Sequence, residues 1–293
     1  MQLLIWLSRL PLGVLYFFAD CIWLFLYWVI RYRRKVVMAN LRRSFPDKSE
    51  AELSLIARHA YRNLADVGVE SLKTLTITGN ELRARVRITN PEVCLQYLSA
   101  GQTVIVMTSH LGNWEWLLSG HALQLGYDVD AIYKELTTPW FDSLMKRIRS
   151  RFGPLPVEMK QVARVLVTRK SVTRIIAMVA DQTPFPGNAY WTTFLHQDTP
   201  FFTGAAGIAR RTGYPVLYVG MRRVKRGHYE TWFEPLATPP YHNQATDTER
   251  IIEAYARKIE CDIQQCPDQW LWSHNRWKHQ RISANTVQNQ GIE

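Results

Sequence analysis

The 293-residue sequence has only four cysteines, Cys21, Cys94, Cys261 and Cys266, and no two of them form a Cys-x-x-Cys pair. The Cys-x-x-Cys spacing is typical of structural zinc sites and dithiol redox motifs. Because it is missing here, we expect reduced thiols and no metal centre. The glycine-rich loops that cradle nucleotide phosphates, G-x-x-x-x-G-K-[ST] and G-x-G-x-x-G, are also missing. The sequence therefore gives no reason to expect a metal ion or a cofactor.

Motifs for covalent catalysis are missing as well. There is no G-x-S-x-G elbow, which presents a nucleophilic serine, and no cysteine lies near His110, the histidine singled out below. Internal repeats and low-complexity tracts are absent, while 47% of the residues are hydrophobic and 21% are charged. This composition carries no signature of disorder, so we expect most of the chain to fold as one main domain.

The formal net charge of the chain is +11. An excess of this size favours an acidic partner, which leaves nucleic acid, an anionic membrane surface and an acidic protein as candidates. Aromatic residues are not interleaved with basic ones as in single-strand or RNA-binding modules, so we expect no nucleic-acid partner. A non-catalytic basic protein on a membrane surface remains an alternative on composition alone.

Residues 1–35 are predicted to anchor the chain to a membrane. Residues 10–30 carry one charge, Asp20, and are about long enough to cross ~30 Å of hydrocarbon. The basic block Arg31, Arg33, Arg34 and Lys35 follows, as expected at the cytoplasmic end of a helix. No small-residue cleavage site follows, so a removed signal peptide is not indicated. A buried core helix and a helix lying in the membrane interface stay open as alternatives.

From about residue 86, short β-rich runs alternate with helical segments. The predicted strands are residues 102–108, 128–133, 175–180 and 215–221, and the predicted helices between them are 114–125, 140–152 and 203–212, each followed by glycine. This alternation predicts an α/β fold with a mostly parallel central sheet flanked by helices, which we place in residues 36–281. Residues 282–293 form a polar tail.

Two capping sequences predict where long helices begin. Ser49 and Glu52 form a capping box before an amphipathic helix. Thr246 and Glu249 are expected to cap the last helix in the same way. The residues expected on the buried face of that last helix are Ile251, Ile252, Tyr255, Ile259 and Ile263.

The stretch from Thr108 to Glu115 carries the candidate catalytic groups. It lies where a predicted strand gives way to a helix, and open α/β sheets bind ligands at the carboxyl ends of strands. Gly112 permits a tight turn, Asn113 can cap the helix, and Glu115 can reach back to the imidazole of His110. A carboxylate on one ring nitrogen leaves the other free as a base. We therefore predict that His110 deprotonates a hydroxyl that attacks an activated acyl group, with a structural role at the helix terminus as the alternative.

His110-Leu-Gly-Asn-Trp-Glu115 resembles the H-x4-E signature of the late acyltransferases of lipid A assembly, a branch of the glycerolipid acyltransferase group. An apolar N-terminal segment and the stretches Asn40–Pro46, Ala180–Pro184 and Trp270–Lys278 are similar to other blocks of that family. These blocks extend over essentially the whole chain in order and spacing. Their combination makes the resemblance specific, although each block alone is weak.

The resemblance implies a glycerolipid-acyltransferase-like fold and transfer of a fatty acyl chain from acyl carrier protein to a hydroxyl of a lipid A precursor. The acceptor is then an anionic glycolipid, and the site faces the cytoplasm at a bacterial inner membrane. Carried over by position, His110 is the general base and Glu115 its orienting partner. The substrate-binding residues expected around them are Asn113, Lys134, Arg149, Arg151 and Asp181.

The chain departs from the family pattern at two places. Lys134 stands where an arginine is common, and lysine binds phosphate without bidentate geometry. Residues 194–202 read FLHQDTPFF where the family shows a short Phe-Phe-Gly segment. A lysophospholipid or aminolipid acceptor, coenzyme A as donor, and thioester hydrolysis therefore stay open as alternatives.

Two further histidines lie in segments of interest. His121, on the helix after the motif, is expected to be packed and not catalytic. His274 stands among three tryptophans in the last family block, where it either lies near the site or belongs to an aromatic clamp.

Overall fold

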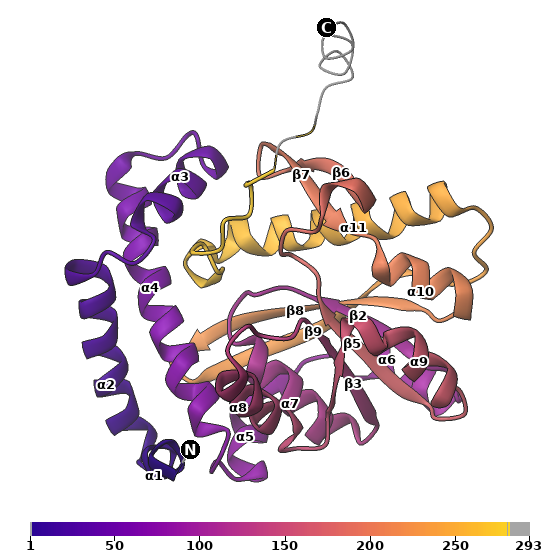
Figure 1. Cartoon of the computed structure of the whole chain (residues 1–293), viewed down its shortest axis with the longest axis horizontal. Helices are drawn as coiled ribbons and strands as arrows, with labels where there is room; N and C mark the ends of the chain where they lie inside the picture. The colour runs from indigo at the N-terminus through magenta and orange to yellow at the C-terminus, as the bar shows by residue number, and fades with distance from the viewer. Residues whose placement is uncertain (1, 280, 282–293) are drawn as a thin grey trace, which may run out of the picture.

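The structure of the chain, a computed structural model, describes residues 2–279 and residue 281 (Figure 1). The predicted tail, residues 282–293, lies outside the described residues. The α-helices are α1 (Gln2–Ser8), α2 (Leu12–Leu24), α3 (Arg34–Ser44), α4 (Glu50–Lys73), α5 (Gly79–Arg85), α6 (Glu92–Ser99), α7 (Trp114–Leu125), α8 (Pro139–Ser150), α9 (Val162–Thr168), α10 (Gly204–Thr212) and α11 (Gln244–Gln265). The strands are β1 (Val86–Ile88), β2 (Val104–Thr108), β3 (Asp128–Tyr133), β4 (Leu155–Glu158), β5 (Arg174–Val179), β6 (Ala189–Phe194), β7 (Gln197–Phe202), β8 (Val216–Lys225) and β9 (His228–Ala237).

Seven strands form the central sheet in the order β1-β9-β8-β2-β5-β3-β4. Every neighbouring pair in this sheet is parallel except β8 and β9, which form a long antiparallel hairpin. The predicted α/β fold with a mostly parallel sheet is therefore confirmed. The segment that departs from the family pattern forms most of a separate antiparallel hairpin of β6 and β7.

Helices cover both faces of the sheet, with α10 and α11 on one side and α5 and α7 on the other (Figure 1). Strand β2 shows why, since all five of its residues are buried. Ile105 and Met107 belong to one apolar cluster, and Val104 and Val106 belong to the other. Because successive side chains of a strand point to opposite faces, only a sheet covered on both sides accepts such a run.

Of the two predicted helix starts, one is confirmed and one is wrong. Ser49 and Glu52 form the expected capping box at the start of α4. The cap expected at Thr246 was wrong by three residues, because Asn243 caps α11 and accepts hydrogen bonds from the backbone of Ala245 and Thr246. The predicted buried face of α11 is confirmed, since all five of its residues are fully buried.

The apolar N-terminus folds onto the rest of the chain. Residues 10–30 were expected to form one apolar helix, and the structure has one from Leu12 to Val29, because α2 continues into a π-helical turn, Phe25–Val29. Pro11 separates this helix from α1. The stretch Leu12–Val29 is apolar enough to cross a membrane, with a mean hydropathy of 1.8. In the structure, α2 packs along α4 (Figure 1).

Candidate active site

His110 and Asp181 meet where two neighbouring parallel strands end. His110 follows β2 and Asp181 follows β5, so the paired strands bring two residues 71 positions apart to the same edge of the sheet. Oδ1 of Asp181 lies 2.6 Å from Nδ1 of His110, and Oδ2 accepts the backbone N–H of His110 at 2.9 Å. The carboxylate thereby fixes both the ring and the loop that carries it.

The charge state of Asp181 sets the tautomer of His110. Burial raises the pKa of Asp181, but attraction to His110 and hydrogen bonds from His110 and Trp270 outweigh burial and lower this pKa to about 2. An ionised carboxylate only accepts hydrogen bonds, so in the neutral imidazole of His110 the proton is on Nδ1 and the lone pair on Nε2. Nε2 lies 3.3 Å from Nε2 of Gln182, and the imidazole is partly exposed.

The loop that holds His110 depends on a glycine. Gly112 has a φ of +66°, and a Cβ there would lie 3.0 Å from Cγ of Met221. Both the left-handed backbone and the close approach disfavour a larger residue. The expected tight turn is thus present, with the N–H of Gly112 donating to the carbonyl of Gln269 at 3.0 Å.

The segment Gln269–Trp277 closes over this loop. Leu111 and Trp270 form an antiparallel bridge, and the indole of Trp270 donates to Oδ2 of Asp181 at 2.8 Å. Asn40 in α3 donates to the carbonyls of Trp272 and His274, each at 3.0 Å. The blocks around residues 181 and 270 therefore meet at His110, and the block around residue 40 holds the second of them in place.

Glu115 does not hold His110, which corrects the prediction that it is the orienting partner. Its carboxylate is engaged by Arg149 of α8, with Nε–Oε2 at 3.0 Å and Nη2–Oε1 at 2.6 Å. The pair is largely buried and ties the first turn of α7 to the last turn of α8. The carboxylate that the motif spacing assigned to Glu115 comes from Asp181 instead, because strand pairing brings Asp181 closer to the ring than helix geometry brings Glu115.

Three other expected substrate-binding residues have different surroundings. Asn113 is fully buried. Its side-chain oxygen caps α7 by accepting from the N–H of Trp116, and its side-chain NH₂ group donates to Glu70, so the oxygen and the nitrogen both have partners. Arg151 donates to the carbonyls of Thr74 and Ile77 beyond the end of α4. These contacts give Asn113 and Arg151 positioning roles. Lys134 is exposed just beyond β3, where it is open to a substrate anion.

His121 and His274 have different surroundings. His121 is buried and its Nε2 lies 2.8 Å from the hydroxyl of Thr231, and burial lowers its pKa to about 3, so the expected packing role is confirmed. His274 accepts from the N–H of Thr183, two residues after Asp181. Burial lowers the pKa of His274 to about 4, so it stays neutral beside the site.

A buried carboxylate outside the motif, on α4, supports the start of α7. Glu70 in α4 is fully buried and accepts hydrogen bonds from three side chains at 2.6 Å each, Tyr16 of α2, Tyr229 of β9 and Asn113 at the start of α7. Burial raises the pKa of Glu70, and the three donors oppose this. Glu70 thus connects the N-terminal helix with the His110 loop.

Replacement of Glu70 tests this connection. Glu70→Ala removes the acceptor of three donors, two of them on buried residues, and is expected to lower the free energy of unfolding by about 3 kcal/mol, because each such group costs at least ~1 kcal/mol. Glu70→Gln should lose much less, since the two tyrosine hydroxyls can rotate to accept as well as donate. Denaturant unfolding followed by circular dichroism measures both. Glu249→Ala, on the exposed surface of α11, is the control. Equal losses for the two Glu70 variants would contradict this assignment.

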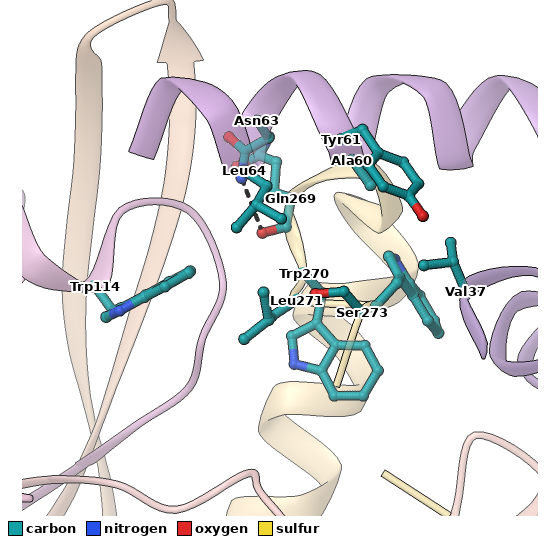
Figure 2. A pocket seen from close by; sticks show the side chains of 11 residues that line it. Val37, Ala60, Tyr61, Asn63, Leu64, Trp114, Gln269, Trp270, Leu271 and Ser273 are labelled. Atoms are coloured by element: carbon teal, nitrogen blue, oxygen red, sulfur yellow. Dashed lines mark hydrogen bonds between the residues drawn. The ribbon is translucent and has the colours of Figure 1, made fainter. Parts of the chain in front are cut away.

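A small, mostly apolar pocket that is partly open to solvent adjoins the His110 loop. It lies between α4 and the segment Gln269–Ser273, with Trp114 at one end and Val37 of α3 at the other (Figure 2). The ring centroids of Trp114 and His110 lie 5.0 Å apart. Among the described residues, Oδ1 of Asn63 in the cavity wall is a buried acceptor without a hydrogen-bond partner, which suits a ligand that offers an N–H or O–H.

The model of the family described as bacterial lipid A biosynthesis acyltransferase matches residues 1–279. The chain belongs to this family. It is 21% identical over 285 residues to the lipid A biosynthesis palmitoleoyltransferase of Escherichia coli (strain K12), covering 97% of this chain and 91% of that protein. The same identity and coverage hold for a lipid A biosynthesis acyltransferase of Shigella flexneri. The chain is therefore an acyltransferase of the lipid A biosynthesis family, with an apolar N-terminal helix that is a candidate membrane anchor.

Proposed function

We propose that the protein transfers a fatty acyl chain from an acyl carrier protein thioester to a hydroxyl of a lipid A precursor, with His110 as general base. The observation that carries the proposal is the contact between His110 and the ionised Asp181, which leaves Nε2 as the basic nitrogen at a partly exposed position. Asp181, and not Glu115, is the residue that orients the base. With an anionic glycolipid as acceptor and a carrier protein as donor, we expect the reaction at the cytoplasmic face of a bacterial inner membrane.

In the reaction, the acceptor hydroxyl displaces Gln182 from Nε2 of His110. As the oxygen attacks the thioester carbonyl, Nε2 takes the hydroxyl proton and the charge moves to the carbonyl oxygen, to which the freed amide of Gln182 donates. The tetrahedral intermediate then breaks its C–S bond, and the thiol leaves with the proton from His110. The products are an ester and the free carrier thiol, and the imidazole returns to its starting tautomer.

We assign the start of the acyl-binding surface to the mostly apolar pocket beside Trp114, because Trp114 packs on the ring of His110; a whole chain must extend beyond this small pocket. Lys134, exposed beyond the carboxyl end of β3, is available to a phosphate of the acceptor. Arg149 is engaged by Glu115, and Arg151 by the backbone carbonyls that follow α4, so we assign both to positioning and not to phosphate binding.

His110→Ala tests the proposal. Loss of general-base catalysis is expected to lower kcat by roughly 10³ with little change in KM. The measurement uses purified protein in detergent, acyl carrier protein loaded with a defined acyl chain, and a lipid A precursor, with products read by mass spectrometry. His242→Ala, at an exposed histidine before α11, is the control. Transfer by His110→Ala at the control rate would overturn the mechanism, and transfer by the unaltered enzyme only to lysophospholipid or aminolipid would overturn the acceptor.

A further inference from the structure

The helix α2 and the π-helical turn after it have two unlike faces. From Leu12 to Val29, the buried residues Leu12, Leu15, Ala19 and Tyr27 recur every three to eight positions on the side that packs against the domain. The exposed residues of the same stretch are Gly13, Val14, Phe17, Phe18, Cys21, Ile22, Leu24, Phe25, Trp28 and Val29. None of them is charged, and a continuous exposed apolar face of this size marks an interaction surface.

The inner face of α2 is fastened to the domain by polar groups. Arg226 holds the carboxylate of Asp20 with two hydrogen bonds of 3.0 Å, and Arg62 of α4 adds another at 3.0 Å. Arg226 also pairs with the buried Asp66 of α4. One turn away from Asp20, Tyr16 donates to Glu70. The helix is thus part of the domain along its length.

These contacts are incompatible with a helix that crosses the bilayer. Asp20 lies at the middle of Leu12–Val29, and its partner Arg226 belongs to the turn between β8 and β9, beside the exposed Lys225. A crossing helix would carry this turn and its charges to the centre of the hydrocarbon. Charged groups and irregular backbone are strongly disfavoured there unless protein or a water-filled cavity surrounds them.

Charges at both ends of the apolar face point to a different placement. Arg9 precedes α2 and Arg31 follows the π-helical turn, and both are exposed. Trp6 and Trp28 are exposed near these ends. In a helix that lies in the membrane plane, both ends are at the depth of the lipid head groups, where arginine and tryptophan are favoured and anionic lipids attract the cations.

We propose that the protein binds an anionic lipid surface without crossing it, with the outer face of α2 and its π-helical turn sunk into one leaflet and the inner face still on the domain. The inference rests on the proposed function only in taking the acceptor to be a membrane lipid. It places the whole chain on one side of the membrane. The helix that contacts the lipid surface is then also linked to the active-site loop, through the hydrogen bonds of Tyr16 and Asn113 to Glu70.

Cys21 tests this placement, because it is exposed on the outer face and lies near the middle of Leu12–Val29. Cys94 is buried, so replacing Cys261 and Cys266 by serine leaves Cys21 as the reactive thiol. The full chain, labelled there with an environment-sensitive fluorophore, is bound to vesicles of phosphatidylethanolamine and phosphatidylglycerol. Quenchers attached near the head group should then quench at least twofold more strongly than quenchers near the chain ends. Stronger quenching from the chain ends would put Cys21 at mid-bilayer and overturn the proposal.

A matched control and a second variant complete the test. A chain that keeps Cys261 on α11 and has serine at positions 21, 94 and 266 should show no lipid quenching. The double variant Phe17→Ser, Phe25→Ser should bind the vesicles at least tenfold more weakly, because each buried phenyl ring is worth roughly a tenfold change or more. Unchanged vesicle binding would overturn the assigned surface. Acyl transfer in detergent, compared between the unaltered enzyme and His110→Ala, tests the proposed function without a membrane. Its result therefore distinguishes failure of the proposed function from failure of this placement.

Discussion

Asp181→Asn is expected to lower kcat by roughly 10³ to 10⁴ while the protein stays folded, by analogy with amide replacement of the carboxylate in serine protease triads. Oδ2 of Asp181 accepts two N–H donors, from the backbone of His110 and from Trp270, so the amide oxygen of an asparagine would take that position. Its NH₂ group would then face Nδ1 of His110. A donor there forces the imidazole into the tautomer with the proton on Nε2, which cannot accept a proton from the acceptor hydroxyl.

The measurement is the separate determination of kcat and KM, together with the melting temperature. Asp198→Asn is the matched control, since Asp198 is an exposed carboxylate on β7. Nitrogen NMR of labelled histidine gives an independent readout, because it reports which ring nitrogen carries the proton. A folded Asp181→Asn protein with kcat within tenfold of the control would show that Asp181 does not set the state of the base.

Glu115→Gln is expected to lower the free energy of unfolding by about 3 to 5 kcal/mol, because it leaves the guanidinium of Arg149 buried without its counter-charge. The bidentate pair is largely withdrawn from water, so solvent compensates little for the loss. Arg149→Met should lower the free energy of unfolding by a similar amount, because it leaves the carboxylate of Glu115 buried without its counter-charge. The double variant Glu115→Leu, Arg149→Met should recover most of the stability, since apolar residues of similar volume often replace a buried ion pair without loss.

The double variant also decides what Glu115 does. If the pair acts by holding α7 and the His110 loop against α8, acyl transfer should return together with stability, to within about tenfold of the unaltered enzyme. Denaturant unfolding and the acyl transfer assay measure the two properties on the same samples. Arg222→Met, which removes an exposed arginine paired with Glu230, is the control for loss of a surface ion pair. A stable but inactive double variant would assign the pair a direct contact with substrate and contradict a positioning role.

Local sequence determined the elements that position the site. Alternating β-rich and helical runs predicted β3 and α7 with their observed bounds, because hydrophobic periodicity and a terminal glycine act within the segment itself. Gly112 and Asn113 were assigned a turn and a cap for the same reason, and the structure has both. The start of α11 was missed because Asn243 is as good a cap as Thr246, and the nearby sequence does not choose between them.

Only the tertiary structure decided which carboxylate holds His110. Glu115 lies five positions after His110, and the motif made it the natural partner, whereas Asp181 reaches the ring because β2 pairs with β5. Strand order depends on how all the helices pack on the sheet, which no short stretch encodes. The same holds for the apolar segment at the N-terminus. Its composition predicts contact with lipid, but not which face of the helix makes that contact. The ion pair between Asp20 and Arg226, 206 residues apart, holds one face of α2 on the domain and leaves the other face exposed.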